Sequence, residues 1–263
     1  MGESPLAGKT AIVTGASSGL GVDFARELAR RGCRLVLVAR REDRLKQLQA
    51  ELQSQHNVTA MVVTLDLSDP QAPQMLYDHL KAQHVTADVL VNNAGYGCFG
   101  EFLDIPWDKE RQMLLLDIVA LTHLTKLFAR DMVKRGFGYV LQVASIGGYQ
   151  PSPTYASYSA AKAYVLMFGE ALNFELRNTG VSCTVVSPGV TATEFLQVAG
   201  QKTTWYQRVT MMSSAEVAAI GIRAMLKRRS SVVTGWFNAL VAFFTRLTPR
   251  PMLASMAYQL MKN

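Results

Sequence analysis

Residues 10–21 read TAIVTGASSGLG, a short apolar run followed by a glycine-rich loop and the start of a helical pattern. Glycines are needed at such a junction because the backbone must turn sharply and come close to a pyrophosphate. The N-terminus of the following helix offers free N–H groups and the positive end of its dipole to that anion. The order of strand, loop and helix therefore predicts a dinucleotide site, with a purely structural turn as the alternative. The predicted contacts are Gly15, Ser17, Ser18, Gly19, Leu20 and Gly21.

Strand-like runs and helix-length amphipathic segments alternate along the rest of the chain. Leu45, Leu48 and Leu52, for example, recur at helical spacing among charged residues. This order implies a parallel sheet covered by helices on both faces. We predict an α/β fold, a single Rossmann-type domain with a doubly wound, parallel, seven-stranded sheet. The strands are expected at residues 10–14, 34–39, 61–66, 88–92, 139–144, 182–187 and 231–234.

Two segments depart from this alternation. Residues 191–212 are long, mixed and threonine-rich, and they follow a strand end, where open α/β sheets bind ligands, so we interpret them as a lid. Residues 1–235 are expected to form the dinucleotide-binding and catalytic domain, and residues 236–263 an apolar and basic helical tail. Large apolar side chains expected near the site favour a hydrophobic substrate, although core or interface packing explains several of them equally well. They are Phe99, Tyr149, Phe195, Leu196, Trp205, Tyr206, Met211 and Met212.

The positive charge of the chain is concentrated in the tail. The net charge is +7, and the segment from Lys227 to Asn263 holds six basic residues and no acidic one. Such asymmetry is compatible with contact with anionic lipid, an acidic protein partner or nucleic acid, and a solvated or inter-subunit surface is the alternative. The WFNALVAFFTRL stretch at 236–247 has the form of an interfacial anchor, and a subunit interface is the slightly favoured alternative. A role in nucleic-acid binding is not expected.

The three cysteines, Cys33, Cys98 and Cys183, are scattered and lack metal-ligand spacing. We expect free, buried thiols in a reducing compartment and no metal site. The sequence shows neither a signal-peptide pattern nor roughly 20 uninterrupted apolar residues, so we predict a cytoplasmic protein, or one held at the surface of a membrane by its tail.

The end of the second expected strand indicates which dinucleotide binds. It reads Ala39-Arg40-Arg41, with two guanidinium groups and without the carboxylate that would hold a ribose 2′-hydroxyl. Arginine is the side chain best shaped for phosphate oxygens, so Arg40 and Arg41 favour NADP. The alternative is that both are solvated residues at the start of a charged helix.

Five motifs in register resemble the short-chain dehydrogenase/reductase family. The resemblance covers residues 6 to about 235 and is closest in appearance to bacterial NADP-dependent oxidoreductases of unassigned substrate. It implies hydride transfer between NADP(H) and a carbonyl or secondary alcohol, and a homodimer or homotetramer. The motifs are Thr14-Gly15-x-x-x-Gly19-x-Gly21, Asn92-Asn93-Ala94-Gly95, Ser145, Tyr158-x-x-x-Lys162 and Pro188-Gly189.

Tyr158 and Lys162 have a physical reason to act together. They are four residues apart, so on one helix their side chains project from the same face. A free tyrosine has a pKa of about 10, and a nearby ammonium favours the phenolate, so we expect Lys162 to lower the pKa of Tyr158 and make it the acid–base group. The resemblance implies that Ser145 hydrogen-bonds the substrate oxygen and that Lys162 also binds the nicotinamide ribose.

The resemblance places further residues along the cofactor. It implies that Asp66 and Leu67 lie near the adenine and that the segment from Asn92 to Gly95 follows the dinucleotide. For Asn92 and Asn93, a structural role in tying down a turn is a credible alternative. The remaining implied cofactor contacts are Asn93, Ala94, Gly95, Pro188, Gly189, Val190 and Thr191.

Asp117 departs from the family pattern. It stands where the family usually has an asparagine whose helix irregularity holds a water in the proton relay from the lysine. Aspartate keeps an acceptor but loses the amide donor, and if it pairs with Lys162 it could alter the pKa of Tyr158. Asp117 therefore leaves open a non-catalytic NADP(H)-binding sensor as an alternative to a carbonyl reductase.

The basic tail leaves open a second alternative, a 3-oxoacyl thioester reductase, because the acidic carrier-protein partner of such an enzyme would suit it.

Overall fold

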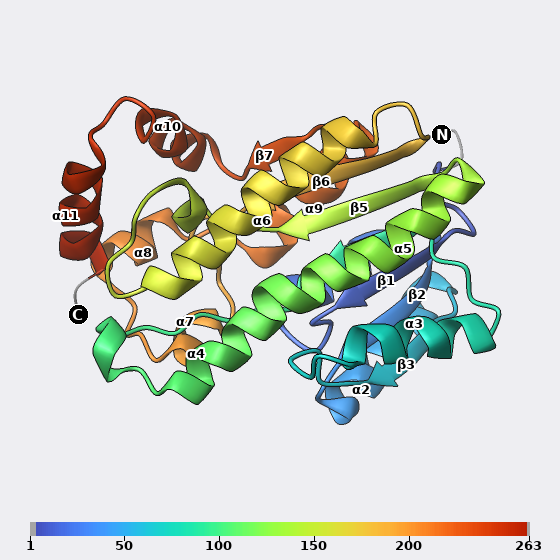
Figure 1. The fold of residues 1–263 in the computed structure, drawn as a ribbon. Helices are drawn as coiled ribbons and strands as arrows, with labels where there is room; N and C mark the ends of the chain where they lie inside the picture. Colours follow the sequence, from blue (N-terminus) through green and yellow to red (C-terminus); the bar gives the residue numbers. More distant parts are fainter. Residues whose placement is uncertain (1–3, 262–263) are drawn as a thin grey trace.

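The computed structural model describes residues 4–261, apart from the side chains of Trp205 and Tyr206. Within this part of the chain, seven parallel strands form one sheet in the order β3-β2-β1-β4-β5-β6-β7 (Figure 1). The predicted fold is confirmed, and the strand bounds differ from the predicted ones by at most two residues. The strands are β1 (Thr10–Thr14), β2 (Arg34–Ala39), β3 (Ala60–Thr64), β4 (Val89–Asn92), β5 (Gly138–Val143), β6 (Val181–Ser187) and β7 (Ser231–Val233).

Helices cover both faces of the sheet (Figure 1). Helices α1 (Gly19–Ala29), α2 (Glu42–His56) and α9 (Ser214–Leu226) pack on one face, and α3 (Ala72–Ala82), α5 (Leu121–Arg135) and α6 (Ala156–Glu175) pack on the other. Short helices stand at the carboxyl ends of the strands and in the tail. They are η1 (Phe102–Asp104), α4 (Trp107–Leu114), the π-helical η2 (Leu115–Ala120), η3 (Ile146–Tyr149), α7 (Phe195–Ala199), α8 (Trp205–Thr210), α10 (Trp236–Phe244) and α11 (Arg250–Met261).

The central strands β1, β4, β5 and β6 are buried at every position, because helices cover both faces of the sheet. In β1, Ala11 and Val13 join the core cluster on one face while Ile12 joins the cluster on the other. Alternate side chains of a strand point to opposite faces, so this is the expected division. The strand order reverses between β1 and β4, which are paired at Val13 and Val91. Open α/β sheets bind ligands at such a switch point, beyond the carboxyl ends of the strands.

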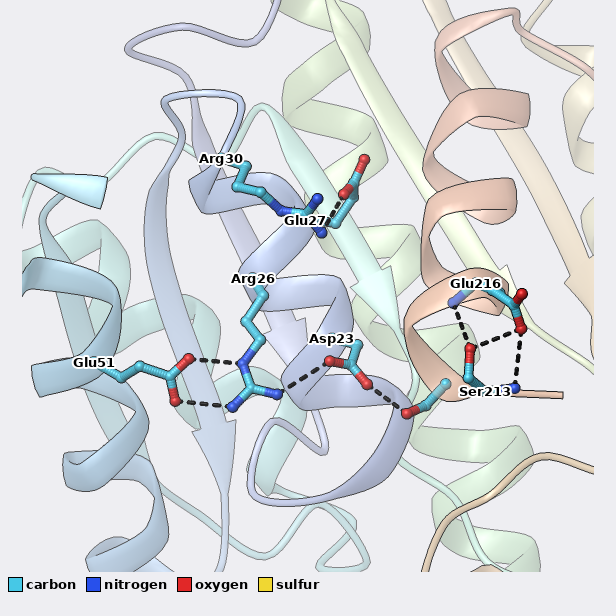
Figure 2. A network of polar contacts seen from close by, with 8 residues as sticks. Asp23, Arg26, Glu27, Arg30, Glu51, Ser213 and Glu216 are labelled. Carbon is cyan, nitrogen blue, oxygen red and sulfur yellow. Dashed lines mark hydrogen bonds and ion pairs between the residues drawn. The ribbon is translucent and has the colours of Figure 1, made fainter. Parts of the chain in front are cut away.

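Polar contacts hold α1 beside its two helical neighbours (Figure 2). The Arg26 guanidinium donates to both carboxylate oxygens of Glu51 on α2, at 2.7 and 2.8 Å, and to Asp23 at 3.1 Å. Asp23 also accepts a hydrogen bond from Ser214 at the start of α9. Bidentate arginine–carboxylate pairs add geometric specificity, so these contacts fix the direction of the helix that follows the glycine loop.

The long helical run Trp107–Arg135 contains a local irregularity at Asp117. The run spans 29 residues and is apolar enough to cross a membrane by length and composition, but half of its most apolar window is buried inside the fold, as in a core helix. The π-helical segment η2 interrupts it between α4 and α5. Such π-bulges are rare and occur frequently at functional sites.

The predicted lid and tail pack against each other. The lid ends meet in a bridge between Thr191 and Met212, and α7 and α8 lie between these ends. Gln201 of the lid donates to the carbonyl of Met261 at 3.1 Å, at the end of α11. Figure 1 shows α10 and α11 beyond the carboxyl ends of the strands, on the same side of the molecule as the lid helices. The three cysteines are free and buried, as expected.

Candidate active site

The loops after β1 and β4 are locked together at the switch point. Thr14 Oγ1 accepts hydrogen bonds from the N–H groups of Asn93 and Ala94, at 2.9 and 3.0 Å. Gly15 has φ +67°, and a Cβ at this position would lie 2.9 Å from both Ala94 Cα and Asn93 Nδ2. Only glycine allows this close approach of two backbones.

The start of α1 fits a pyrophosphate. Gly19 has φ +52°, and a Cβ there would lie 2.9 Å from Thr193 Cγ2 of the lid. At Gly21, a Cβ would collide with the carbonyl oxygen of Gly15. The N-cap residue Ser18 makes no side-chain capping bond, and the first turn holds no acidic residue. The backbone N–H groups of this turn and the positive end of the helix dipole are therefore suited to an anion.

Arg41, which caps α2, and Arg44, within α2, share the carboxylate of Glu194 from the lid. Arg41 donates to Ser17 Oγ at 3.2 Å and to Glu194 Oε2 at 3.0 Å, and Arg44 donates to Glu194 Oε1 at 2.6 Å. The hydrogen bonds from Arg44 and Arg41 hold the pKa of Glu194 below its usual value. Arg40 lies 3.5 Å from Asp66. The end of β2 has no carboxylate of its own, but Asp66 and Glu194 from other segments lie beside its arginines.

An open groove of about 1100 Å³ separates α1 from the lid. Its walls include Gly19 and Arg26 on one side and Glu194, Leu196 and Met211 on the other. It belongs to the phosphate end of the crevice and is distinct from the place where Tyr158 lies.

Ser145, Tyr158 and Lys162 come together at the carboxyl end of β5. Ser145 follows this strand, and its Oγ accepts the N–H of Gly147 at 3.1 Å. Lys162 Nζ donates to the carbonyl of Val143 at 3.2 Å and lies 5.6 Å from the centre of the Tyr158 ring. The predicted grouping of a hydroxyl, a phenol and an ammonium is therefore present in the structure.

Asp117 forms a buried ion pair with Lys162. Its side chain is fully buried, and Oδ2 lies 2.9 Å from Lys162 Nζ, whose own side chain is 6% exposed. The second oxygen, Oδ1, accepts the N–H of Tyr96 at 3.2 Å. Oδ2 has no aligned hydrogen bond, so the contact is best described as an ion pair. Gly95 makes room for the carboxylate, since a Cβ there would lie 2.9 Å from both oxygens.

The ion pair changes the electrostatics of the phenol. Burial raises the pKa of Asp117, and the charge of Lys162 opposes this shift. Burial and then the charge of Asp117 raise the pKa of Tyr158 above its ordinary value of 10.0, while a hydrogen bond from Ser145 acts in the lowering direction. The pKa of Tyr158 is therefore raised and not lowered as predicted, first because the phenol is buried and second because the Asp117 carboxylate lies close to it.

An aromatic cluster surrounds the Tyr158 ring. Phe195 of the lid lies 5.3 Å away and Tyr155 5.7 Å away, measured between ring centres. Phe99 extends the cluster, with its ring 5.3 Å from that of Tyr155. The Tyr155 hydroxyl donates to Gln201 Oε1 at 2.9 Å, which ties the lid to the start of α6. The cluster offers an apolar surface next to the phenol.

The remaining predicted residues divide between side-chain and backbone roles. The Asn93 amide donates to the carbonyl of Thr14 at 2.9 Å, and the buried Asn92 amide donates to Thr125 at 2.9 Å, so both side chains have the structural role given as the alternative. Leu67 is 5% exposed within the core, and Leu20 packs against the core. Contacts of these residues with a cofactor stay predictions, through backbone atoms.

The segment from Pro188 to Thr191, which the resemblance places along the cofactor, lies between the grouping of Ser145, Tyr158 and Lys162 and the tail. Pro188 is buried, and its carbonyl accepts the N–H of Ile146 at 2.9 Å. The amide of Asn238, on α10, packs directly against Gly189. Val190 and Thr191, which are partly exposed, lead into the lid, where the N–H of Met212 donates to Val190 at 3.0 Å. Their contact with a cofactor stays a prediction.

Some of the large apolar side chains expected near the site pack elsewhere. Met212 packs against Asn238, with its sulfur 3.9 Å from the amide nitrogen, and Tyr149 packs against the core cluster next to α6. The side chains of Trp205 and Tyr206 lie outside the described residues. Among residues 4–261, no group of three or more histidine, cysteine, aspartate or glutamate side chains is placed to hold a metal ion.

Sequence reasoning missed Glu194, Tyr155 and Gln201. Glu194 is the only acidic residue in 191–212, a stretch close to the predicted site, and this could have drawn attention to it. Tyr155 stands three residues before Tyr158, at the N-cap of α6, and a spacing of three residues at a helix start could have indicated a ring contact. Nothing in the sequence indicates that Gln201 joins Tyr155 to the tail.

Comparisons with known proteins agree with this geometry. The model of a family described as short chain dehydrogenase matches residues 9–204. A very-long-chain 3-oxoacyl-CoA reductase of Bos taurus is 32% identical over 211 residues, which cover 78% of this chain but only 65% of the bovine protein. An uncharacterized oxidoreductase of Myxococcus xanthus is 30% identical over 252 residues, which cover 96% of this chain and 97% of that protein.

A solved structure has the same fold over most of its length. The short-chain dehydrogenase from Sphingobium yanoikuyae in complex with NADPH is 30% identical and superimposes with a TM-score of 0.81. The superposition covers 91% of this chain and 94% of that chain.

Proposed function

The chain belongs to the short chain dehydrogenase family and is an oxidoreductase, and from this premise we propose that it is an NADP-dependent carbonyl reductase or alcohol dehydrogenase for a hydrophobic small molecule. The single observation that carries the proposal is the grouping of Ser145, Tyr158 and Lys162 beside the glycine cradle at the switch point. A bound nicotinamide would supply or accept a hydride there. The residues of the chain supply the proton, hold the substrate oxygen and exclude water.

Ser145 and Tyr158 act on the substrate oxygen. Because the Ser145 oxygen already accepts the N–H of Gly147, its own proton is free to be donated to a carbonyl or alkoxide oxygen. The Tyr158 phenol gives its proton to that oxygen in reduction and takes it back in oxidation. Both groups stabilise the negative charge that develops on the oxygen as the carbonyl is reduced.

Asp117 biases this proton transfer towards reduction. The buried carboxylate holds Lys162 in position, and its charge favours the protonated phenol. A tyrosine that keeps its proton is prepared to donate it, which is the role required when a carbonyl becomes an alcohol. Lys162 is therefore a positioning residue as well as a predicted contact of the ribose.

Arg41 and Arg44 support the choice of NADP. Their guanidinium groups converge on one carboxylate, and a 2′-phosphate would present the same kind of charge to the same donors. Arg40 adds positive charge nearby. Glu194 competes for these arginines, so it is expected to weaken the affinity for the phosphate.

The aromatic cluster of Phe99, Tyr155 and Phe195 around Tyr158 supports a hydrophobic substrate. A second candidate is a 3-oxoacyl thioester reductase, which is favoured by the similarity to the bovine very-long-chain 3-oxoacyl-CoA reductase. The proton chemistry would be the same for both substrates. The two candidates differ in the substrate: a 3-oxoacyl thioester carries a coenzyme A or carrier-protein group that must bind outside the lid, whereas a free ketone or aldehyde does not.

The direct test is a screen of carbonyl compounds followed by NADPH absorbance. We expect consumption of NADPH with apolar ketones or aldehydes, and a loss of about 100-fold or more in Tyr158→Phe, since general acid catalysis contributes 10² to 10⁴. Tyr164→Phe is the matched control, because Tyr164 lies on the same helix and bonds Thr122 at 3.0 Å, away from the site. Free ketones, coenzyme A thioesters and acyl-carrier thioesters are compared to separate the two candidates. NADPH binding without turnover of any carbonyl would favour the non-catalytic sensor instead.

Asp117→Asn tests how the carboxylate sets the proton transfer. With its charge removed, the pKa of Tyr158 falls, so alcohol oxidation begins to rise at a lower pH and carbonyl reduction also begins to fall at a lower pH. The pH profiles of kcat/KM in both directions measure this shift. Turnover is expected to be intact or raised. Asp131→Asn, which removes the partner of Lys81 on α5 at 2.7 Å, is the control and leaves the profiles unchanged. A large loss of turnover in Asp117→Asn would show that Asp117 has its own role.

Titrations of NADPH and NADH test the contact of Arg41 with the 2′-phosphate. Arg41→Ala is expected to weaken NADPH binding about 10- to 100-fold, the value of a hydrogen bond to a charged group, and to leave NADH nearly unchanged. Glu194→Gln is expected to tighten NADPH binding a few-fold, since an exposed ion pair is modest in strength. Glu42→Gln, which removes the partner of Lys46 on the same helix as Arg44, serves as control. Equal weakening of both dinucleotides by Arg41→Ala contradicts the assignment.

A further inference from the structure

We propose that α10, α11 and the turn between them form a docking surface for an anionic lipid bilayer, independent of which reaction the site performs. The surface consists of large apolar side chains that are exposed on this part of the chain, flanked by arginines. These side chains are Trp236, Phe237, Leu240, Phe243, Phe244, Leu247, Met252 and Met256.

The polarity of α10 is reversed relative to a helix that faces water. Its sequence is WFNALVAFF, and its single polar side chain, Asn238, is 3% exposed and donates to the Thr234 carbonyl at 2.8 Å. The outward side chains are apolar, with Trp236 at 81% and Phe243 at 53% exposure. A helix on an aqueous surface normally turns its polar side chains outward. The outer face of α10 is therefore suited to an apolar medium.

The apolar face continues past the end of α10. Leu247, in the turn, is 69% exposed, and Met252, on α11, is 57% exposed. The inner side of α11 packs on the body of the protein through Leu253 and Ala257, which are buried. Both helices are thus held against the fold by one side while the other side is left uncovered in the monomer.

Charge distinguishes between a bilayer and a second copy of the chain. Arg246 and Arg250 are exposed beside the apolar side chains, and the sequence from 227 to 263 contains no acidic residue. A two-fold interface brings the same patch of both subunits together, so the tail of one copy would offer no carboxylate to the arginines of the other. Anionic headgroups complement the arginines, and acyl chains complement the aromatic rings.

The position of the tail orients the molecule on such a surface. Met261 bonds Gln201 of the lid, and the Tyr258 hydroxyl lies 3.3 Å from Glu101 in the loop before α4. These contacts hold α11 against two segments that surround the site, beyond the carboxyl ends of the strands (Figure 1). Docking through the tail would therefore bring the lid, rather than the opposite end of the sheet, close to the bilayer.

The test is flotation of the full chain with vesicles of phosphatidylcholine alone or mixed with phosphatidylglycerol. We expect binding to the mixed vesicles that decreases with added salt, and much weaker binding to phosphatidylcholine alone. Arg246→Glu combined with Arg250→Glu is expected to reduce binding about tenfold or more, because each basic residue near an anionic surface contributes about 1 kcal/mol. Trp236→Ser combined with Leu247→Ser is expected to reduce it to a similar extent by removing buried apolar area.

Matched controls lie on two helices that cover the sheet, outside the tail. Met75→Ser replaces an exposed methionine on α3, and Lys46→Glu reverses an exposed charge on α2, and both are expected to bind vesicles like the unchanged protein. Thermal unfolding checks that every variant folds. If Trp236→Ser combined with Leu247→Ser fails to fold, the variant Arg246→Glu combined with Arg250→Glu still tests the proposal. Absence of binding to mixed vesicles, or binding unaffected by the tail variants, overturns the proposal. Sedimentation that shows a dimer dissociated by Trp236→Ser and Leu247→Ser, without vesicle binding, assigns the surface to a second copy instead.

Discussion

An ammonium group buried in the protein must be paired, and in this fold that requirement falls on Lys162. The residue is 5% exposed, and its Nζ is satisfied by the Asp117 carboxylate at 2.9 Å and the Val143 carbonyl at 3.2 Å. Removing one partner of a buried ion pair costs several kcal/mol because the other charge is left uncompensated. The three groups come from α6, the π-helical η2 and β5, so this one contact fixes the relative position of three elements. The site is assembled around it.

The same contact sets the chemistry of the neighbouring phenol. The arrangement is not a lone lysine that draws a proton from tyrosine, since the carboxylate offsets the ammonium and, with burial, raises the pKa of Tyr158. The glycine cradle at Gly15 and Gly21 brings the dinucleotide end of the crevice to the same edge of the sheet. The Tyr158 phenol, the Ser145 hydroxyl and the glycine loop therefore lie at the carboxyl ends of the strands, the edge where open α/β sheets bind ligands.

The sequence predicted what depends on local pattern. Strands such as β2 were recognisable because burial on both faces makes nearly every residue apolar, and the glycine loop because close backbone approach excludes a side chain. Contacts between distant segments were not predictable. Arg41 and Glu194 are separated by 153 positions, and only the folded lid brings them within 3.0 Å. The sign of the shift in the pKa of Tyr158 was wrongly predicted, because it depends first on the burial of the phenol in the folded chain and then on the position of the Asp117 carboxylate. The apolar face of residues 236–247 was predicted from the sequence, whereas the inward position of Asn238 depends on its contact with the Thr234 carbonyl.

A double-mutant cycle on the free energy of unfolding tests most directly whether the ion pair of Lys162 and Asp117 organises the site. Urea denaturation is measured for the unchanged protein, Lys162→Met, Asp117→Asn and the double variant. Lys162→Met is expected to lose about 3 to 5 kcal/mol, and Asp117→Asn less, because the asparagine oxygen can still accept a hydrogen bond from Lys162 Nζ. The double variant is expected to lose clearly less than the sum of the two. Losses that simply add would contradict the account, because they would show that the two charges do not stabilise each other.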